Sequence, residues 1–179
     1  TIETVKNLGK ELGFEAFVVS KREMGNITVS STTIRKELSE NGNVEQASNL
    51  LGRAYLLNGI VIHGDKRGRS IGYPTANLKA EHPNKVIPKD GVYVVKVRVE
   101  GEWFNGMMNI GNRPTFEGAQ KALEVNIFEF DKDIYGQTIQ VRFLKRLRDE
   151  VKFSGIDELV AQLDQDKEDS LNFLNIVSS

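Results

Sequence analysis

The sequence contains no cysteine, which excludes disulfides, thiolate metal sites and a cysteine nucleophile. It also has no excess of charge of either sign, because 24 basic and 25 acidic residues leave a net charge of -1. This balance excludes a chain-wide attraction to nucleic acid or to an anionic membrane. A charged ligand would therefore have to be recognised locally.

Long hydrophobic runs are also missing. The longest, such as residues 55–57 and 60–62, are far shorter than the ~20 residues of a membrane helix, and the first ten residues lack a signal-peptide core. We therefore expect a cytoplasmic protein with no membrane partner. The 179 residues are enough for one domain, or for one domain and a fragment.

The first fifty residues follow a different pattern from the rest. Their spacing of apolar and capping residues predicts helices at 2–12, 30–38 and 43–52, and a short strand at 14–20. Gly13 and Gly52 are suited to end helices in the left-handed conformation, and Asn43 is a predicted N-cap. We expect residues 1–52 to form a small α/β unit and residues 53–179 to form a separate, mainly β domain.

From residue 53 onward the chain is rich in short strands. β-branched and aromatic segments between turn residues predict strands at 56–63, 91–99, 102–110, 123–130 and 138–143. Because most of these have no helix between them, we expect an antiparallel barrel or sandwich. A last helix is predicted after Ser154, with Ile156, Val160 and Leu163 on its apolar face. The predicted fold class is mainly β.

A glycine-rich basic loop, HGDKRGRSIG, covers residues 63–72. Glycines let backbone N–H groups approach an anion closely, and the cations of the loop supply charge, so phosphate is a natural ligand. The loop is not a P-loop, because Lys66 is not followed by Ser or Thr. A solvated hairpin tip is the alternative interpretation.

Thr75 and Asn77 follow Pro74, which favours extended chain, so their oxygens project to the same side. Such a neutral oxygen pair suits Mg²⁺, which takes its other ligands from water and substrate phosphates. An ordinary Asn/Thr turn cap is the alternative.

Glu124 lies in a predicted strand, on the same face as Asn126. A carboxylate there could accept a proton from an attacking hydroxyl, or could simply face solvent. Ser30, Arg35 and a helix start could form a further phosphate site, or ordinary N-capping with solvated cations. Neither His63 nor His82 has metal-ligand spacing, and we interpret both as structural.

Several motifs follow one another in a fixed order: HGDKRGRSIGYPTANL at 63–78, GVY at 91–93, GNRPTF at 111–116, Glu124, and DIYG at 133–136. Over essentially its whole length the chain resembles the C-terminal portion of the bacterial bifunctional riboflavin kinase/FMN adenylyltransferases. The resemblance implies a six-stranded antiparallel Greek-key β-barrel with a C-terminal helix. It also implies transfer of the ATP γ-phosphate to riboflavin, with Mg²⁺ as cofactor and with ADP and FMN as products.

The resemblance implies roles for individual residues. Glu124 corresponds to the proposed catalytic base, and Thr75 and Asn77 correspond to the Mg²⁺ ligands. The residues implied to bind ATP are Gly64, Lys66, Arg69, Gly72, Pro74, Thr75, Asn77 and Tyr135. The residues implied to contact the flavin are Asn112, Leu147, Arg148 and Phe153.

The N-terminal part departs from the family pattern. Residues 29–35, VSSTTIR, match the signature that closes the adenylyltransferase domain, but the nucleotide motif expected earlier in that domain is absent. We therefore expect residues 1–52 to be a remnant of that domain, and we expect no adenylylation of FMN to FAD.

Two further alternatives remain. A flavin-binding module without catalysis would have no use for a metal-phosphate site at Thr75 and Asn77. A nucleic-acid-binding barrel would need a basic face with exposed aromatic residues, which the balanced charge does not favour.

Overall fold

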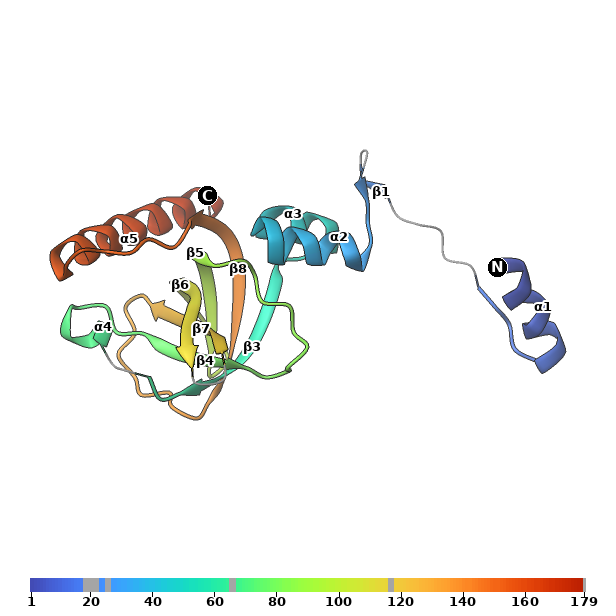
Figure 1. The fold of residues 1–179 in the computed structure, drawn as a ribbon, viewed down its shortest axis with the longest axis horizontal. Coiled ribbons are helices and arrows are strands. Elements are labelled where there is room, and N and C mark those ends of the chain that lie inside the picture. The colour runs from blue at the N-terminus through green and yellow to red at the C-terminus, as the bar shows by residue number, and fades with distance from the viewer. Residues whose placement is uncertain (18–22, 25–26, 65–66, 116–117, 179) are drawn as a thin grey trace.

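The computed structural model describes residues 1–17, 23–24, 27–64, 67–115 and 118–178 (Figure 1). Its elements in chain order are α1 (Ile2–Leu12), β1 (Glu23–Met24), β2 (Ile27–Thr28), α2 (Ser31–Lys36), the π-helix η1 (Glu37–Asn41), α3 (Val44–Leu51), β3 (Tyr55–Ile62), α4 (Arg67–Ser70), β4 (Ala76–Ala80), β5 (Gly91–Val99), β6 (Glu102–Thr115), β7 (Gly118–Ile127), β8 (Thr138–Arg148) and α5 (Ile156–Ser178). Two predictions lie outside the described residues: the nucleotide contact of Lys66, and residues 18–20 of the first strand. Residues 14–17 of that strand are in no strand, so this part of the prediction is wrong.

Strands β3 to β8 form a closed barrel in the order β3-β4-β7-β6-β5-β8, and every pairing is antiparallel. Strands β5, β6 and β7 are consecutive neighbours, and β8 returns to lie beside β5, which is Greek-key order. The pairing of β3 with β8, from Tyr55 opposite Phe143 to Ile60 opposite Thr138, closes the barrel. The predicted six-stranded antiparallel Greek-key barrel with a C-terminal helix is confirmed.

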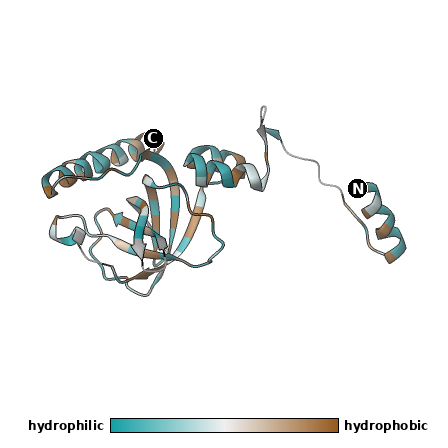
Figure 2. Cartoon of the chain, in the orientation of Figure 1, coloured by the Kyte–Doolittle hydropathy of each residue, from teal (hydrophilic) through white to brown (hydrophobic). Residues whose placement is uncertain are grey.

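Hydrophobic and hydrophilic residues alternate along much of the barrel strands (Figure 2). The inward-facing hydrophobic residues form one buried cluster. Val95, Val97 and Val141 are completely buried, and the Tyr93 and Phe143 rings meet edge to face with centroids 5.4 Å apart. Burial of such side chains stabilises the fold by about 1.5–3 kcal/mol each. The outward-facing sides of the strands are therefore available for packing against α5 and for polar functional groups.

The short helices before the barrel pack against it. Leu38, Val44 and Ala47 belong to the same buried cluster as the barrel residues, and the Lys89 N–H donates to the Leu38 carbonyl at 2.8 Å. The predicted caps are confirmed for α3, because the Gln46 N–H donates to Asn43 Oδ1 at 3.0 Å and Gly52 is left-handed.

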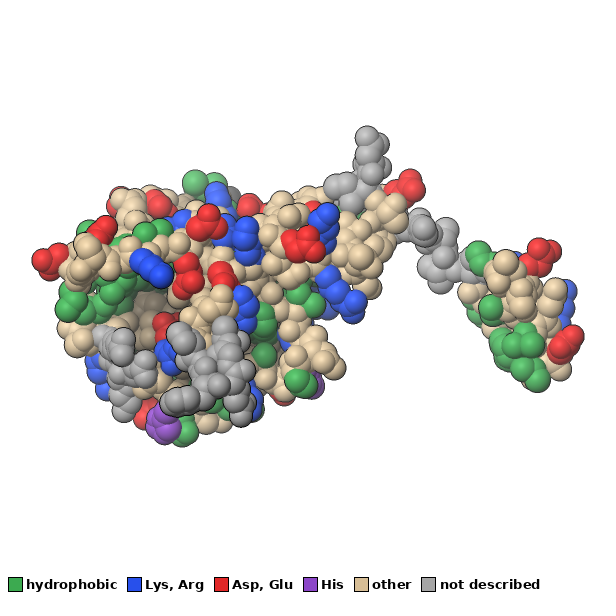
Figure 3. All heavy atoms as spheres, viewed as in Figure 1, with side chains coloured by type: hydrophobic (Ala, Val, Ile, Leu, Met, Phe, Trp, Pro, Cys, Tyr) green, Lys and Arg blue, Asp and Glu red, His purple; other side chains and the backbone are tan. Residues whose placement is uncertain are grey.

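Helix α1 lies apart from the barrel (Figure 1), and Gly13 ends it in the predicted left-handed conformation. Its apolar side chains are exposed, as the space-filling view shows (Figure 3). They are Ile2, Val5, Leu8 and Leu12. None of the helices in the described part of the chain combines the length and apolar character that crossing a membrane requires.

Candidate functional site

The site begins with the two faces of β7. Leu123, Val125 and Ile127 point into the barrel, so Glu124 and Asn126 point out of it. The predicted alternation at these positions is confirmed. Polar groups on this strand therefore face away from the apolar interior and toward the space beneath α5.

The register of the sheet sets polar side chains beside Glu124. Asn77 on β4 and Asn109 on β6 are the Cα partners of Glu124 on either side. Cross-strand partners project to the same face of a sheet, so the three residues form one polar row. Sequence positions 77, 109 and 124 become neighbours only through this pairing.

The glycine-rich loop closes onto the end of this row. A Cβ at Gly64 would lie 1.9 Å from Asn77 Nδ2, and a Cβ at Gly68 would lie 2.0 Å from the Tyr73 carbonyl oxygen. Only glycine permits these approaches. Asn126 Nδ2 anchors the following segment by donating to the Pro74 carbonyl at 2.6 Å.

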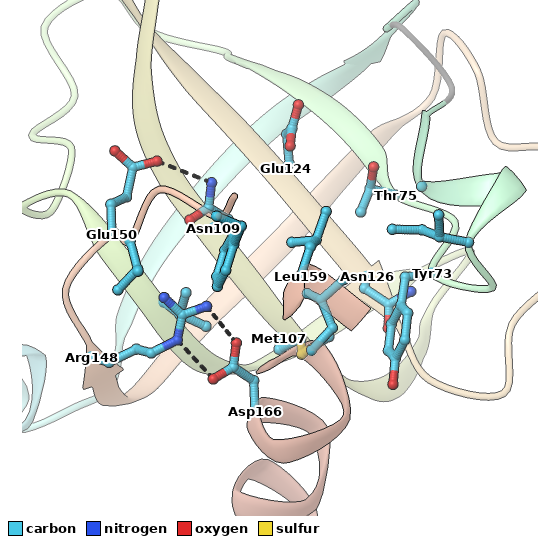
Figure 4. Close-up of a pocket in the computed structure, with 16 residues that line it drawn as sticks. Tyr73, Thr75, Met107, Asn109, Glu124, Asn126, Arg148, Glu150, Leu159 and Asp166 are labelled. Carbon is cyan, nitrogen blue, oxygen red and sulfur yellow. Dashed lines mark hydrogen bonds and ion pairs between the residues drawn. The ribbon is translucent and has the colours of Figure 1, made fainter. Parts of the chain in front are cut away.

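One cavity, of about 330 Å³, lies between β6, β7 and α5 (Figure 4). Figure 3 shows the surface hollowed beneath α5. The side chains lining this cavity are both apolar and polar, and the sheet and α5 each contribute both kinds. They include Tyr73, Thr75, Met107, Asn109, Glu124, Asn126, Arg148, Glu150, Phe153 and Leu163.

A second cavity, of about 550 Å³, adjoins the first and shares Thr75 with it. Six of the residues implied to bind ATP line it, namely Gly64, Arg69, Pro74, Thr75, Asn77 and Tyr135. At the edge of this cavity, the His63 ring stacks on the Tyr135 ring, with the ring centroids 3.5 Å apart. Two aromatic rings thus border a cavity that is also lined by cationic side chains and by neutral side chains that carry oxygen atoms.

Helix α5 forms hydrogen bonds with residues on two sides of the first cavity. Asp166, 1% exposed, receives two hydrogen bonds from Arg148, with Nε to Oδ1 at 2.8 Å and Nη2 to Oδ2 at 2.7 Å. Gln162 Nε2 adds a third at 2.9 Å. On the other flank, the Tyr73 hydroxyl donates to Asp164. Burial, followed by this carboxylate, raises the pKa of Tyr73 to about 12.

Some residues with implied roles lie outside the two cavities. Asn112 Nδ2 donates to Asp90 Oδ2 at 2.7 Å, and Leu147 packs in an apolar cluster with Val94 and Leu174. Gly72 has a left-handed φ of 82° and leads into Tyr73. Of the residues implied to contact the flavin, Arg148 and Phe153 are the two that line the first cavity.

Sequence reasoning missed Arg113, although it lies in one of the motifs. Its Nη2 donates to Glu124 Oε1 at 2.5 Å and to Asn77 Oδ1 at 3.3 Å. It also missed Tyr73 and the two α5 carboxylates. Their contacts span up to 91 residues of sequence, so local spacing carried no signal for them.

The donor set around Thr75 and Asn77 fits Mg²⁺. Among the described residues there is no cluster of three His, Cys, Asp or Glu side chains that could enclose a metal. Asn77 Oδ1 already accepts a hydrogen bond from a cationic group, Arg113. A site with few protein oxygens suits Mg²⁺ that takes its remaining ligands from water and nucleotide phosphates.

Comparison with known proteins gives matches to a family model and to two curated relatives that all include riboflavin kinase in their descriptions. The family model described as Flavokinase, riboflavin kinase, matches residues 51–174. The bifunctional riboflavin kinase/FMN adenylyltransferase of Bacillus subtilis is 43% identical over 96% of this chain and 55% of its own length. Its Haemophilus influenzae counterpart is 47% identical over 82% of this chain and 47% of its own length. The chain thus spans about half the length of these curated relatives.

A solved structure described as a macrolide-efflux protein from Streptococcus pneumoniae is also similar. It superimposes with a TM-score of 0.84 and 43% sequence identity, over 96% of this chain and 55% of that one.

Proposed function

The chain belongs to the riboflavin kinase family, whose model matches residues 51–174, and from that membership we propose that it phosphorylates riboflavin. In this reaction the γ-phosphate of ATP is transferred to the 5′-hydroxyl of riboflavin, giving FMN and ADP. We further infer a cytoplasmic location, with small molecules rather than nucleic acid or a membrane as partners.

The observation that carries this proposal is the pair of cavities joined at Thr75. The cavity with Asn77, Arg69 and Tyr135 suits a nucleotide, because it offers oxygen ligands, a cation and aromatic rings. The cavity with Glu124 has apolar walls and a carboxylate, which suits a flavin with a hydroxylated chain. A phosphoryl group could pass between them at Thr75.

The proposed mechanism is in-line transfer. Glu124 orients the 5′-hydroxyl and accepts its proton while the hydroxyl oxygen bonds to the γ-phosphorus. The bond from that phosphorus to the bridging oxygen breaks, and ADP leaves. Thr75 and Asn77 would hold Mg²⁺, which supplies charge neutralisation on the phosphates. The glycine-rich loop, with Arg69 and Lys66, excludes water.

A flavin assay tests the proposal directly. The chain is incubated with riboflavin, Mg²⁺ and ATP, and the flavins are separated by chromatography. Formation of FMN is expected, and FAD would reveal adenylyltransferase activity. Flavin binding without product would favour the alternative of a binding module.

Glu124→Gln tests the role of the base. Since general-base catalysis contributes about 10²–10⁴-fold, we expect turnover to fall by about that factor, with little change in ATP binding. The matched control is Glu102→Gln, at an exposed position of β6. Near-full turnover by Glu124→Gln would show that Glu124 is not the base.

A further inference from the structure

Arg113 joins the two residues on which the proposed chemistry depends most. It lies opposite Gln120 in the pairing of β6 with β7. Alternation places Gln120 on the same face of β7 as Glu124, so Arg113 extends along the polar row. Its contacts therefore follow from the register of the sheet.

A single guanidinium nitrogen lies where two oxygen acceptors from different strands converge. Nη2 is 2.5 Å from Glu124 Oε1 and 3.3 Å from Asn77 Oδ1. A guanidinium is planar with donors in a fixed fork, so it constrains the direction of a carboxylate. Without such a contact, Glu124 would lose substantial rotamer freedom when it is ordered for the reaction, which costs free energy.

We propose that Arg113 is a positioning residue for the phosphoryl transfer, an inference that rests on the proposed kinase function. It holds Glu124 through Oε1, while Oε2 receives the proton of the substrate hydroxyl. It also occupies Asn77 Oδ1 in the absence of nucleotide, and Asn77 would give up this bond in order to hold Mg²⁺ when the nucleotide complex binds.

The two contacts differ in the way this exchange requires. The bond to Glu124 is short and charge-assisted, whereas the bond to Asn77 is long and its acceptor is neutral. Asn77 is therefore the partner released more easily. The Arg113 side chain is 42% exposed, so water can replace the bond that it gives up.

Arg113→Gln, compared with Arg98→Gln at an exposed position of β5, separates the two parts of the inference. We expect the turnover number of Arg113→Gln to fall by about tenfold or more, because Glu124 is no longer held, with little change in the riboflavin KM. Calorimetric titration of Mg²⁺ into the protein with ADP should show binding about threefold tighter, because Asn77 has no bond to exchange. Arg113→Lys, which keeps the charge, should recover part of the turnover.

Unchanged turnover in Arg113→Gln would overturn the inference. So would a loss of Mg²⁺ affinity like that of Asn77→Ala, because Arg113 would then contribute to nucleotide binding itself. Melting temperatures of the variants distinguish either result from misfolding. If the unaltered chain makes no FMN, the proposed function fails, whereas the metal titration still shows whether Arg113 competes for Asn77.

Discussion

Arg148 and Asp166 form a bidentate ion pair that joins the end of β8 to the middle of α5. Arg148 also donates through Nη1 to the Asp149 carbonyl at 2.9 Å, and its guanidinium lies 5.9 Å from the Phe153 ring centroid. The edge of the guanidinium is thus bonded to protein. The pair holds in place the segment from Arg148 to Phe153, and both of these residues are implied to contact the flavin.

Asp166→Asn should destabilise the protein. Removing one partner of a buried pair leaves an uncompensated charge, and we expect the free energy of unfolding to fall by about 3 kcal/mol. Urea denaturation measures the change. Asp169→Asn on the exposed face of the same helix is the control, and equal midpoints for the two variants would contradict a stabilising role of the pair.

Alkaline pH should affect the tyrosines unequally. Burial raises the pKa of Tyr55 to about 12, and burial together with Asp164 raises that of Tyr73 to about 12. The folded-state pKa values exceed the unfolded value of about 10, so their contribution to stability is complete below pH ~10 and is lost as pH rises toward ~12. Burial also raises the pKa of Tyr93, so ultraviolet titration of phenolate should show three late-titrating groups, and Tyr73→Phe should remove one.

In urea, all phenols should titrate near their ordinary pKa of about 10. If Tyr73→Phe left the late phase of the native titration unchanged, the bond to Asp164 and the burial of Tyr73 would not persist in solution.

Gly64→Ala should disturb Asn77, because the added Cβ would lie 1.9 Å from its Nδ2. Overpacking of this kind costs about 1–3 kcal/mol, which corresponds to about a fivefold or greater loss of Mg²⁺–ADP affinity if the site bears the cost. Calorimetry with Mg²⁺ and ADP measures it. Gly155→Ala is the control, since its Cβ would meet nothing within 4 Å. Equal affinities would show that Asn77 does not contribute to binding.

Removing residues 1–17 should leave the stability of the barrel unchanged, because α1 lies apart from it. Removing residues 1–52 should lower the free energy of unfolding by at least about 3 kcal/mol, since Leu38 and Val44 are buried in the barrel cluster. Thermal and urea unfolding of the two shortened chains measure the difference. Equal stabilities would show that α2 and α3 are dispensable for the barrel.

Sequence patterns predicted most strands because apolar residues alternate wherever one face is buried. β4 was missed although its apolar residues alternate, since it has only five residues and Ala, Asn and Lys have low β-propensity. β6 and β8 continue beyond their predicted ends because their backbone pairing with β7 and β5 extends to Thr115 and Arg148. The alternation of β7 ends after Phe128: Glu129 has a φ of 54°, and Phe130 packs against Phe104 in the barrel cluster, whereas Phe128 belongs to the other buried cluster.

The sequence alone determined an antiparallel barrel or sandwich, the caps of α3, the glycine-rich loop and the candidates Thr75, Asn77 and Glu124, because these depend on local spacing and residue chemistry. Tertiary structure decided which residues meet. Asn77 and Asn109 lie beside Glu124 through strand register, and Arg113 bridges two strands. Asp164 meets Tyr73 and Asp166 meets Arg148 because α5 packs beside the barrel. These contacts depend on chain closure over tens of residues, which no local pattern encodes.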